Sequence, residues 1–155
     1  MGVDVLTEIE IDRPREEVAA YAIDPGNATA WYENIERVDW KPDPPLSVGS
    51  QMSFVARFLG RRLAYTYEIR ELAPGERLVM STSDGPFPME TTYTWQDAGA
   101  GRTRMTLRNR GEPSGFSKVA GPMMARAMSR ANRKDLGRLK EILEARPTGG
   151  GSAGP

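Results

Sequence analysis

Hydrophobic and polar residues alternate over most of the chain before residue 112. In residues 3–11, Val, Thr and Ile alternate mostly with acids, which is the period-two pattern of a strand with one face in water. Six further strands are predicted, over residues 35–41, 51–58, 62–70, 78–82, 89–95 and 102–110. Glycine and proline turns separate the later strands, so we expect an antiparallel meander.

Two short helices are predicted between the first two strands. Asp12 and Pro14 are followed by Glu16 and Glu17, acids that suit the positive end of a helix running to about residue 22. The sequence Asp-Pro-Gly-Asn at residues 24–27 then predicts a turn, and residues 30–32 fit one more helical turn. The sheet is therefore interrupted early in the chain.

One long helix is predicted over residues 116–145. Steps of about 100° per residue from Leu139 define an inward face and leave most charged residues on the other side. The inward residues are Gly121, Met124, Met128, Asn132, Asp135, Leu139, Ile142 and Leu143. The polar atoms of Asn132 and Asp135 need a ligand or buried water, unless Asp135 pairs with a neighbouring Arg and Asn132 bonds to a strand end. Laid across a curved sheet, such a helix lines a pocket.

The composition predicts one globular domain and excludes several kinds of chemistry. A chain of 155 residues with 39% hydrophobic residues can build a single core, which we assign to residues 1–146, with residues 147–155 as a flexible tail. The chain has no Cys and no His, which excludes disulfides, Ser-His-Asp triads and Cys-His dyads. It also removes the usual ligands of transition metals, so neither a metal nor a cofactor is expected.

Charge and hydropathy narrow the expected partners. No apolar run approaches the roughly 20 residues of a membrane-spanning helix, and the first residues do not resemble a leader, so a cytoplasmic protein without an integral membrane segment is expected. The formal net charge is zero and the pI is about 6.4, whereas a nucleic-acid-binding domain is expected to be basic. We therefore expect no nucleic-acid partner. The sequence leaves monomer and homodimer open.

Two segments resemble a known superfamily. They are EIEIDRPREEVAAYAIDPGNATAWYENIERVDW near the start and SRANRKDLGRLKEILEA near the end. With the order of predicted elements, they make residues 3–145 similar to the START-like (SRPBCC) superfamily of polyketide cyclases and dehydrases, pathogenesis-related allergens and lipid-transfer domains. The resemblance implies an α+β helix-grip fold, in which a seven-stranded antiparallel sheet wraps around the C-terminal helix. It also implies a cavity for a small hydrophobic or amphipathic ligand.

Candidate ligand-binding residues follow from the inward strand and helix positions. For each aromatic residue, packing in the core is the alternative role. A shift of one residue in register would reverse the face of Tyr65 and Tyr67. The candidates are Trp31, Phe54, Phe58, Tyr65, Tyr67, Met80, Met89, Tyr93, Trp95, Met105, Asn109, Met124, Met128 and Asn132.

Three functions are compatible with this pattern. The first is a binding module that holds a lipid, a polyketide or a similar metabolite without chemistry, which the absence of His and Cys favours. The second is an enzyme of the cyclase or aromatase kind, with Asp135 as the candidate base and Asn132 and Tyr93 as hydrogen-bond donors. The third is a partner-binding domain that docks an acidic protein on the basic strand face of Arg102, Arg104, Arg108 and Arg110, although such rows are usually solvated sheet faces.

Overall fold

The computed structural model describes residues 3–43, 45–58, 60–84, 88–111 and 121–146. The chain forms the strands β1 (Val3–Ile11), β2 (Ile35–Trp40), β3 (Gln51–Phe58), β4 (Arg61–Ala73), β5 (Arg77–Asp84), β6 (Met89–Asp97) and β7 (Thr103–Gly111). The helices are α1 (Arg15–Ile23), α2 (Ala28–Trp31) and α3 (Gly121–Glu144), with a 3-10 turn at Pro25–Asn27. The predicted order of elements is confirmed. The predicted helix residues 116–120 and the predicted tail lie outside the described residues.

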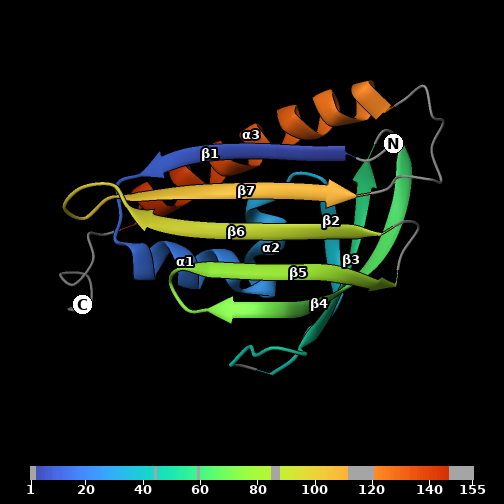
Figure 1. The fold of residues 1–155 in the computed structure, drawn as a ribbon, viewed down its shortest axis with the longest axis horizontal. Coiled ribbons are helices and arrows are strands. Elements are labelled where there is room, and N and C mark those ends of the chain that lie inside the picture. Colours follow the sequence, from blue (N-terminus) through green and yellow to red (C-terminus); the bar gives the residue numbers. More distant parts are fainter. Residues whose placement is uncertain (1–2, 44, 59, 85–87, 112–120, 147–155) are drawn as a thin grey trace.

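The seven strands form one antiparallel sheet in the order β1-β7-β6-β5-β4-β3-β2. Figure 1 shows all three helices on one side of this sheet, with β3 and β2 curving away from the other strands. Residues at two sharp turns, Gly60 (φ +78°) and Gly75 (φ +75°), adopt a left-handed backbone conformation that favours glycine. The helix-grip fold expected from the sequence is therefore confirmed.

Irregular pairing bends the sheet around α3. The register shifts twice between β2 and β3 and twice between β4 and β5, the latter between Thr66 and Tyr67 and between Ile69 and Glu71. Such bulges increase the local twist and bend a strand. On β4, Leu63, Tyr65, Tyr67 and Ile69 nevertheless keep to the inner side, as the alternation predicts. The curvature leaves room between β3 to β6 and the helices.

Two separate groups of buried side chains pack beneath the sheet. The larger group packs the C-terminal half of α3 against α1, α2 and the sheet through Leu136, Leu139 and Leu143. The smaller group joins Met124 and Met128 near the start of α3 to Val3 and Val5 of β1. Leu136 was not among the predicted inward positions, although it lies about 60° from Leu139 around the helix, as far to one side as Met124 and Ile142 lie to the other. Its burial shows that the inward face is wider than predicted.

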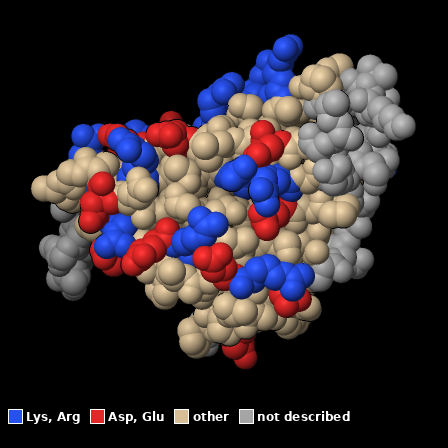
Figure 2. Space-filling view, in the orientation of Figure 1, with Lys and Arg blue, Asp and Glu red and all other residues tan. Residues whose placement is uncertain are grey.

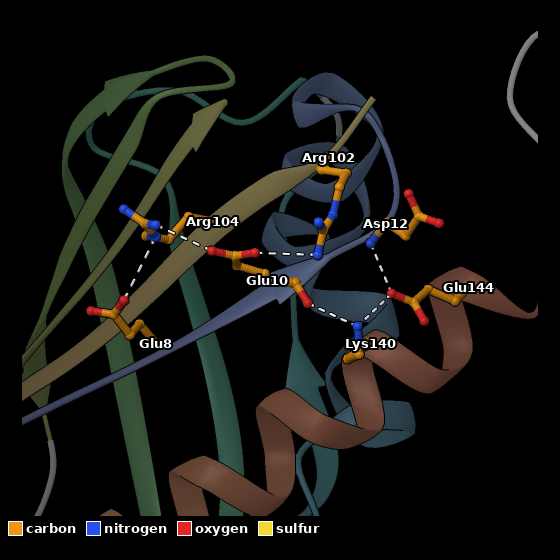
Figure 3. Close-up of polar contacts among 7 residues, drawn as sticks. All are labelled: Glu8, Glu10, Asp12, Arg102, Arg104, Lys140 and Glu144. Atoms are coloured by element: carbon orange, nitrogen blue, oxygen red, sulfur yellow. Dashed lines mark hydrogen bonds and ion pairs between the residues drawn. The ribbon is translucent and has the colours of Figure 1, made fainter. Parts of the chain in front are cut away.

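Polar contacts tie the C-terminal end of α3 to the end of β1. The backbone N–H of Asp12 donates to Glu144 Oε2 at 2.8 Å, and Lys140 Nζ donates both to the Glu10 carbonyl at 2.9 Å and to Glu144 Oε2 at 2.6 Å (Figure 3). The Arg13 guanidinium donates to the backbone carbonyls of Glu144 and Arg146. The Glu144 carbonyl is the last of α3 and the Arg146 carbonyl lies just beyond it. The last carbonyls of a helix lack intrahelical partners, and a cation there also complements the helix dipole. This end of α3 is therefore held in a defined position.

The outer face of the sheet carries charges of both signs. Figure 2 shows acidic and basic side chains interspersed on it. The basic row of β7 is paired with acids of the neighbouring strands. Arg102 pairs with Glu10, Arg104 with Glu8 and Glu10 (Figure 3), and the last two arginines of the row with acids of β1 and β6. The row is therefore neutralised within the sheet, which leaves little excess positive charge to attract an acidic partner. Among the described residues, no helix combines the length and hydropathy needed to cross a bilayer.

Candidate functional site

A cavity of about 160 Å³ lies between the curved sheet and the middle of α3. One wall is the α3 segment that contains Met128, Ala131, Asn132 and Asp135. The opposite wall consists of inward side chains from β3 to β7, and the segment around α1 and α2 closes a third side. The remaining lining residues are Ala22, Ile23, Asp24, Pro25, Ala28, Tyr32, Asn34, Ile35, Met52, Phe54, Ala56, Leu63, Tyr65, Tyr67, Leu78, Met80, Met89, Thr91, Tyr93 and Asn109.

Aromatic rings form a large part of the wall and hold one another in place. Tyr32 lies against the fully buried Trp31 with a centroid distance of 4.1 Å, and Trp31 in turn lies 5.9 Å from Tyr93. On β4, the rings of Tyr65 and Tyr67 are 5.9 Å apart, and Phe54 meets Tyr67 edge to face at 6.2 Å. Ring pairs at these distances and tilts are favourable and restrict the rings. The apolar wall is therefore largely preformed.

A polar group of side chains lies where α2 approaches α3. The hydroxyls of Tyr32 and Tyr93 are 2.5 Å apart and share a hydrogen bond. Burial raises the pKa of both phenols, so they stay protonated at neutral pH. Asp135, which is 3% exposed, accepts a hydrogen bond from the Glu33 backbone N–H at 3.0 Å. Burial raises the pKa of Asp135 to about 6, although the Glu33 N–H opposes this shift.

A second polar group lies deeper in the sheet. Thr91 Oγ1 donates to Asn109 Oδ1 at 2.8 Å across β6 and β7, and both residues line the cavity. Burial raises the pKa of the neighbouring Tyr67, whereas its hydrogen bond with Thr91 lowers it. This hydrogen bond gives Thr91 Oγ1 and Asn109 Oδ1 a partner without a ligand.

Asn132 differs from the other polar residues of the cavity. Its side chain is 4% exposed, and its amide Nδ2 has no hydrogen-bond partner among the described residues. An unsatisfied buried amide costs about 1–3 kcal/mol. The alternative in which Asp135 pairs with an arginine is also not observed, because within the described part of the chain no salt bridge reaches Asp135 and its partner is the Glu33 N–H. The middle of α3 therefore combines an unpaired amide with a buried carboxylate.

The structure places most of the predicted site residues around one cavity. Of the candidates, the cavity is lined by Phe54, Tyr65, Tyr67, Met80, Met89, Tyr93, Asn109, Met128, Asn132 and Asp135. The side chain of Phe58 lies outside the described residues. Whether the lining residues bind a ligand remains a proposal.

Four candidates lie in the core instead of the cavity wall. Trp31, Trp95 and Met105 belong to the larger core group, and Met124 packs with Val3 and Val5 in the smaller one. Alternation identifies the face of a side chain, but not its position along the strand. Trp95 of β6 pairs with Met105 of β7. The two residues lie towards the end of the sheet that α1 and the C-terminal half of α3 cover, so no cavity forms beside them.

Several lining residues were not among the candidates. Thr91 follows the inward alternation of β6, so the period-two pattern could have identified it despite its polarity. Leu63 and Leu78 are likewise inward residues of predicted strands. Tyr32 had no comparable signal, because it follows the four-residue helix α2, which is too short to define a face. Its hydrogen bond to Tyr93 depends entirely on how α2 packs under the sheet.

Comparisons with solved structures agree with this fold. An aromatase/cyclase named Zhui from Streptomyces sp. R1128 matches with a TM-score of 0.79 at 16% identity, covering 97% of this chain and 99% of that chain. A START superfamily protein from Mycobacterium smegmatis matches with a TM-score of 0.77 at 16% identity, covering 92% and 97%. A protein from Thermus thermophilus matches with a TM-score of 0.76 at 20% identity, covering 93% and 99%. At these identities the likeness concerns the fold alone.

Comparison of the sequence with known proteins identifies a family but no individual relative. Among curated proteins, no sequence matches this chain significantly. The profile of one family, described as polyketide cyclase / dehydrase and lipid transport, matches residues 3–144. This range runs from the start of β1 to the end of α3 and includes every described lining residue of the cavity. The chain therefore belongs to the polyketide cyclase / dehydrase and lipid transport family.

Proposed function

We propose that this protein binds a small hydrophobic or amphipathic molecule in the cavity between the sheet and α3. The observation that carries the proposal is the lining itself: an apolar, aromatic wall that meets a few polar groups at the middle of α3, among them the unpartnered amide of Asn132. Small-molecule sites commonly have this composition. The family description names lipid transport, which agrees with a role in holding a ligand.

The volume limits the size of the ligand. A dry apolar cavity of about 150 Å³ holds one benzene molecule, whereas sites for drug-sized ligands measure roughly 300–1,000 Å³. The 160 Å³ observed here therefore suits a ligand with one ring or a short chain. A full-length polyketide or a two-chain lipid requires the walls to move apart.

The first test is native mass spectrometry of the protein purified from its own host, followed by denaturing extraction. We expect a mass increment that disappears on denaturation and yields a compound with an apolar body. The variant Ala131→Phe fills the cavity from α3 and should abolish the increment. Ala127→Phe makes the same change one turn earlier on the helix, outside the lining, and should keep it. An increment that persists in Ala131→Phe places the ligand elsewhere and contradicts the proposal.

A second candidate function is catalysis of the cyclase kind. The observation that favours it is Asp135, whose raised pKa of about 6 suits proton transfer near neutral pH and which lies close enough to Tyr93 to raise the pKa of that phenol. Under this hypothesis Asp135 accepts a proton from a ligand, while Tyr93 and Asn132 donate hydrogen bonds to a carbonyl oxygen. Turnover of a polyketide-like substrate that disappears in Asp135→Asn would establish catalysis. If Asp135→Asn and the parent bind such a compound equally well and neither converts it, catalysis is contradicted and the binding function stands.

A further inference from the structure

We infer that the cavity selects a small apolar molecule that carries a protonated amine, held between the Asp135 carboxylate and the surrounding tyrosine rings. This inference rests on the proposed function, because it specifies the chemical class of the ligand for the same cavity. Its basis is the distribution of charge and aromatic surface around the cavity.

The charges near the cavity disfavour an anionic ligand. Among the described lining residues none is Lys or Arg, whereas two are acids, Asp135 and the more exposed Asp24. The nearest cation along α3, Lys134, is 66% exposed and pairs with Glu33 at 3.0 Å. A carboxylate or phosphate group placed here would lose its water and meet a like charge without a compensating cation, which is costly.

Asp135 has the capacity to hold a cation. Its described hydrogen bond, from the Glu33 N–H, occupies one oxygen, while an ionised carboxylate can accept about four hydrogen bonds. Glu33 and Lys134 are the charged groups that act on it, with opposite signs, and Tyr32 and Tyr93 are neutral neighbours. A protonated amine is a donor with three N–H groups and would pair with the carboxylate in surroundings of low polarity, where such a pair is strong.

Tyrosine rings supply the second attraction. Tyr32, Tyr65, Tyr67 and Tyr93 all line the cavity, and ring contacts keep each of them in position. The faces of aromatic rings attract ammonium groups, and cages of such rings recognise organic cations. Because burial raises the pKa of all four phenols, none of them ionises at neutral pH, and Asp135 remains the buried anion of the site.

Three probes of matched size and different charge test the inference by isothermal titration calorimetry at pH 7.5. The probes are 2-phenylethylammonium, 2-phenylethanol and phenylacetate, each with one ring, as the volume of 160 Å³ requires. We expect the ammonium to bind at least tenfold more tightly than the alcohol, and phenylacetate to give no measurable binding. In Asp135→Asn, the amine should lose at least tenfold in affinity, while the alcohol changes less than threefold.

The matched control is Asp97→Asn, which removes the same charge from an exposed position outside the cavity and should leave the affinity for the amine unchanged. An alcohol that binds as tightly as the amine, or phenylacetate that binds more tightly, would overturn the charge selectivity while the proposed binding function stands. No binding of any of the three probes at millimolar concentration would overturn both.

Discussion

Between Leu136 and Leu143, α3 packs its inward side chains against α1, α2 and the sheet, whereas between Met128 and Asp135 the same helix borders a cavity. The first segment follows the rule of a solid core, with leucines that have no more than 1% of their surface exposed. The second replaces such leucines with a methionine, an alanine, an amide and a carboxylate. Hydrophobic packing thus anchors one half of the helix, and this anchor holds the polar groups of the other half in position.

The largest effect is expected where the packed half is broken. Leu139 is 0% exposed, so Leu139→Ala leaves a cavity in the larger core group and should lower the free energy of unfolding by about 3 kcal/mol. Chemical denaturation at pH 7 measures the change. The control is Met123→Ala on the same helix, where the side chain is 69% exposed, and it should change stability by less than about 0.5 kcal/mol. Similar losses in both variants would show that the helix face is misplaced.

A substitution at Asp135, in the half of α3 that borders the cavity, should raise the free energy of unfolding instead of lowering it. The pKa of Asp135 rises from 3.8 to about 6 on folding, so the folded protein binds this proton more tightly and its stability falls as the pH rises through that window. Asp135→Asn removes the cost of the buried charge while its amide oxygen can still accept the Glu33 N–H. We expect about 2 kcal/mol of added stability at pH 8 and little change at pH 3.5. Equal changes at both pH values would contradict a cost due to charge.

The anchor of the helix end should have an intermediate effect. Arg13→Ala removes the guanidinium that donates to the carbonyls of Glu144 and Arg146, and should lower the free energy of unfolding by about 1.5 kcal/mol. Relative to the parent protein, the variant should also show faster hydrogen exchange in the last turn of α3 but unchanged exchange in the middle of the helix. Arg37→Ala, which removes an exposed arginine that pairs with the nearby Asp39, is the matched control and should change neither quantity. Uniformly faster exchange along α3 would contradict local anchoring.

The smallest effect is expected on the outer face of the sheet. Arg108 pairs with Asp4 on the outer face, where 44% and 52% of the two side-chain surfaces are exposed, and the pair lowers the pKa of the Asp4 carboxyl. Arg108→Ala should change the unfolding midpoint less than Arg13→Ala does, and the difference should shrink as salt is added, because exposed pairs are screened. Midpoints measured at low and high ionic strength test this order. If Arg108→Ala lowers the unfolding midpoint more than Arg13→Ala does, the prediction that exposed pairs contribute least to stability is wrong.

The fold was predictable because its signals are periodic. Alternation along seven segments and the spacing of Met128, Asn132, Asp135 and Leu139 identify the inward side chains without knowledge of the partners. The face of Tyr65 and Tyr67, which the sequence left open to a shift of register, is inward. Positions along the elements were less predictable. Trp95 and Met105 point inward as expected, yet they pack in the core because α1 covers that end of the sheet.

The sequence by itself determined the order of the elements, the two faces of each strand and the presence of an amide and a carboxylate on the inward face of the last helix, because each depends on local spacing. Only the tertiary structure decided where the sheet bends away from the helix, and therefore which inward residues meet empty space. It also brought Tyr32 to Tyr93 and Glu33 to Asp135, pairs separated by 61 and 102 residues. Contacts of this range depend on bulges, helix placement and packing, which no local pattern encodes.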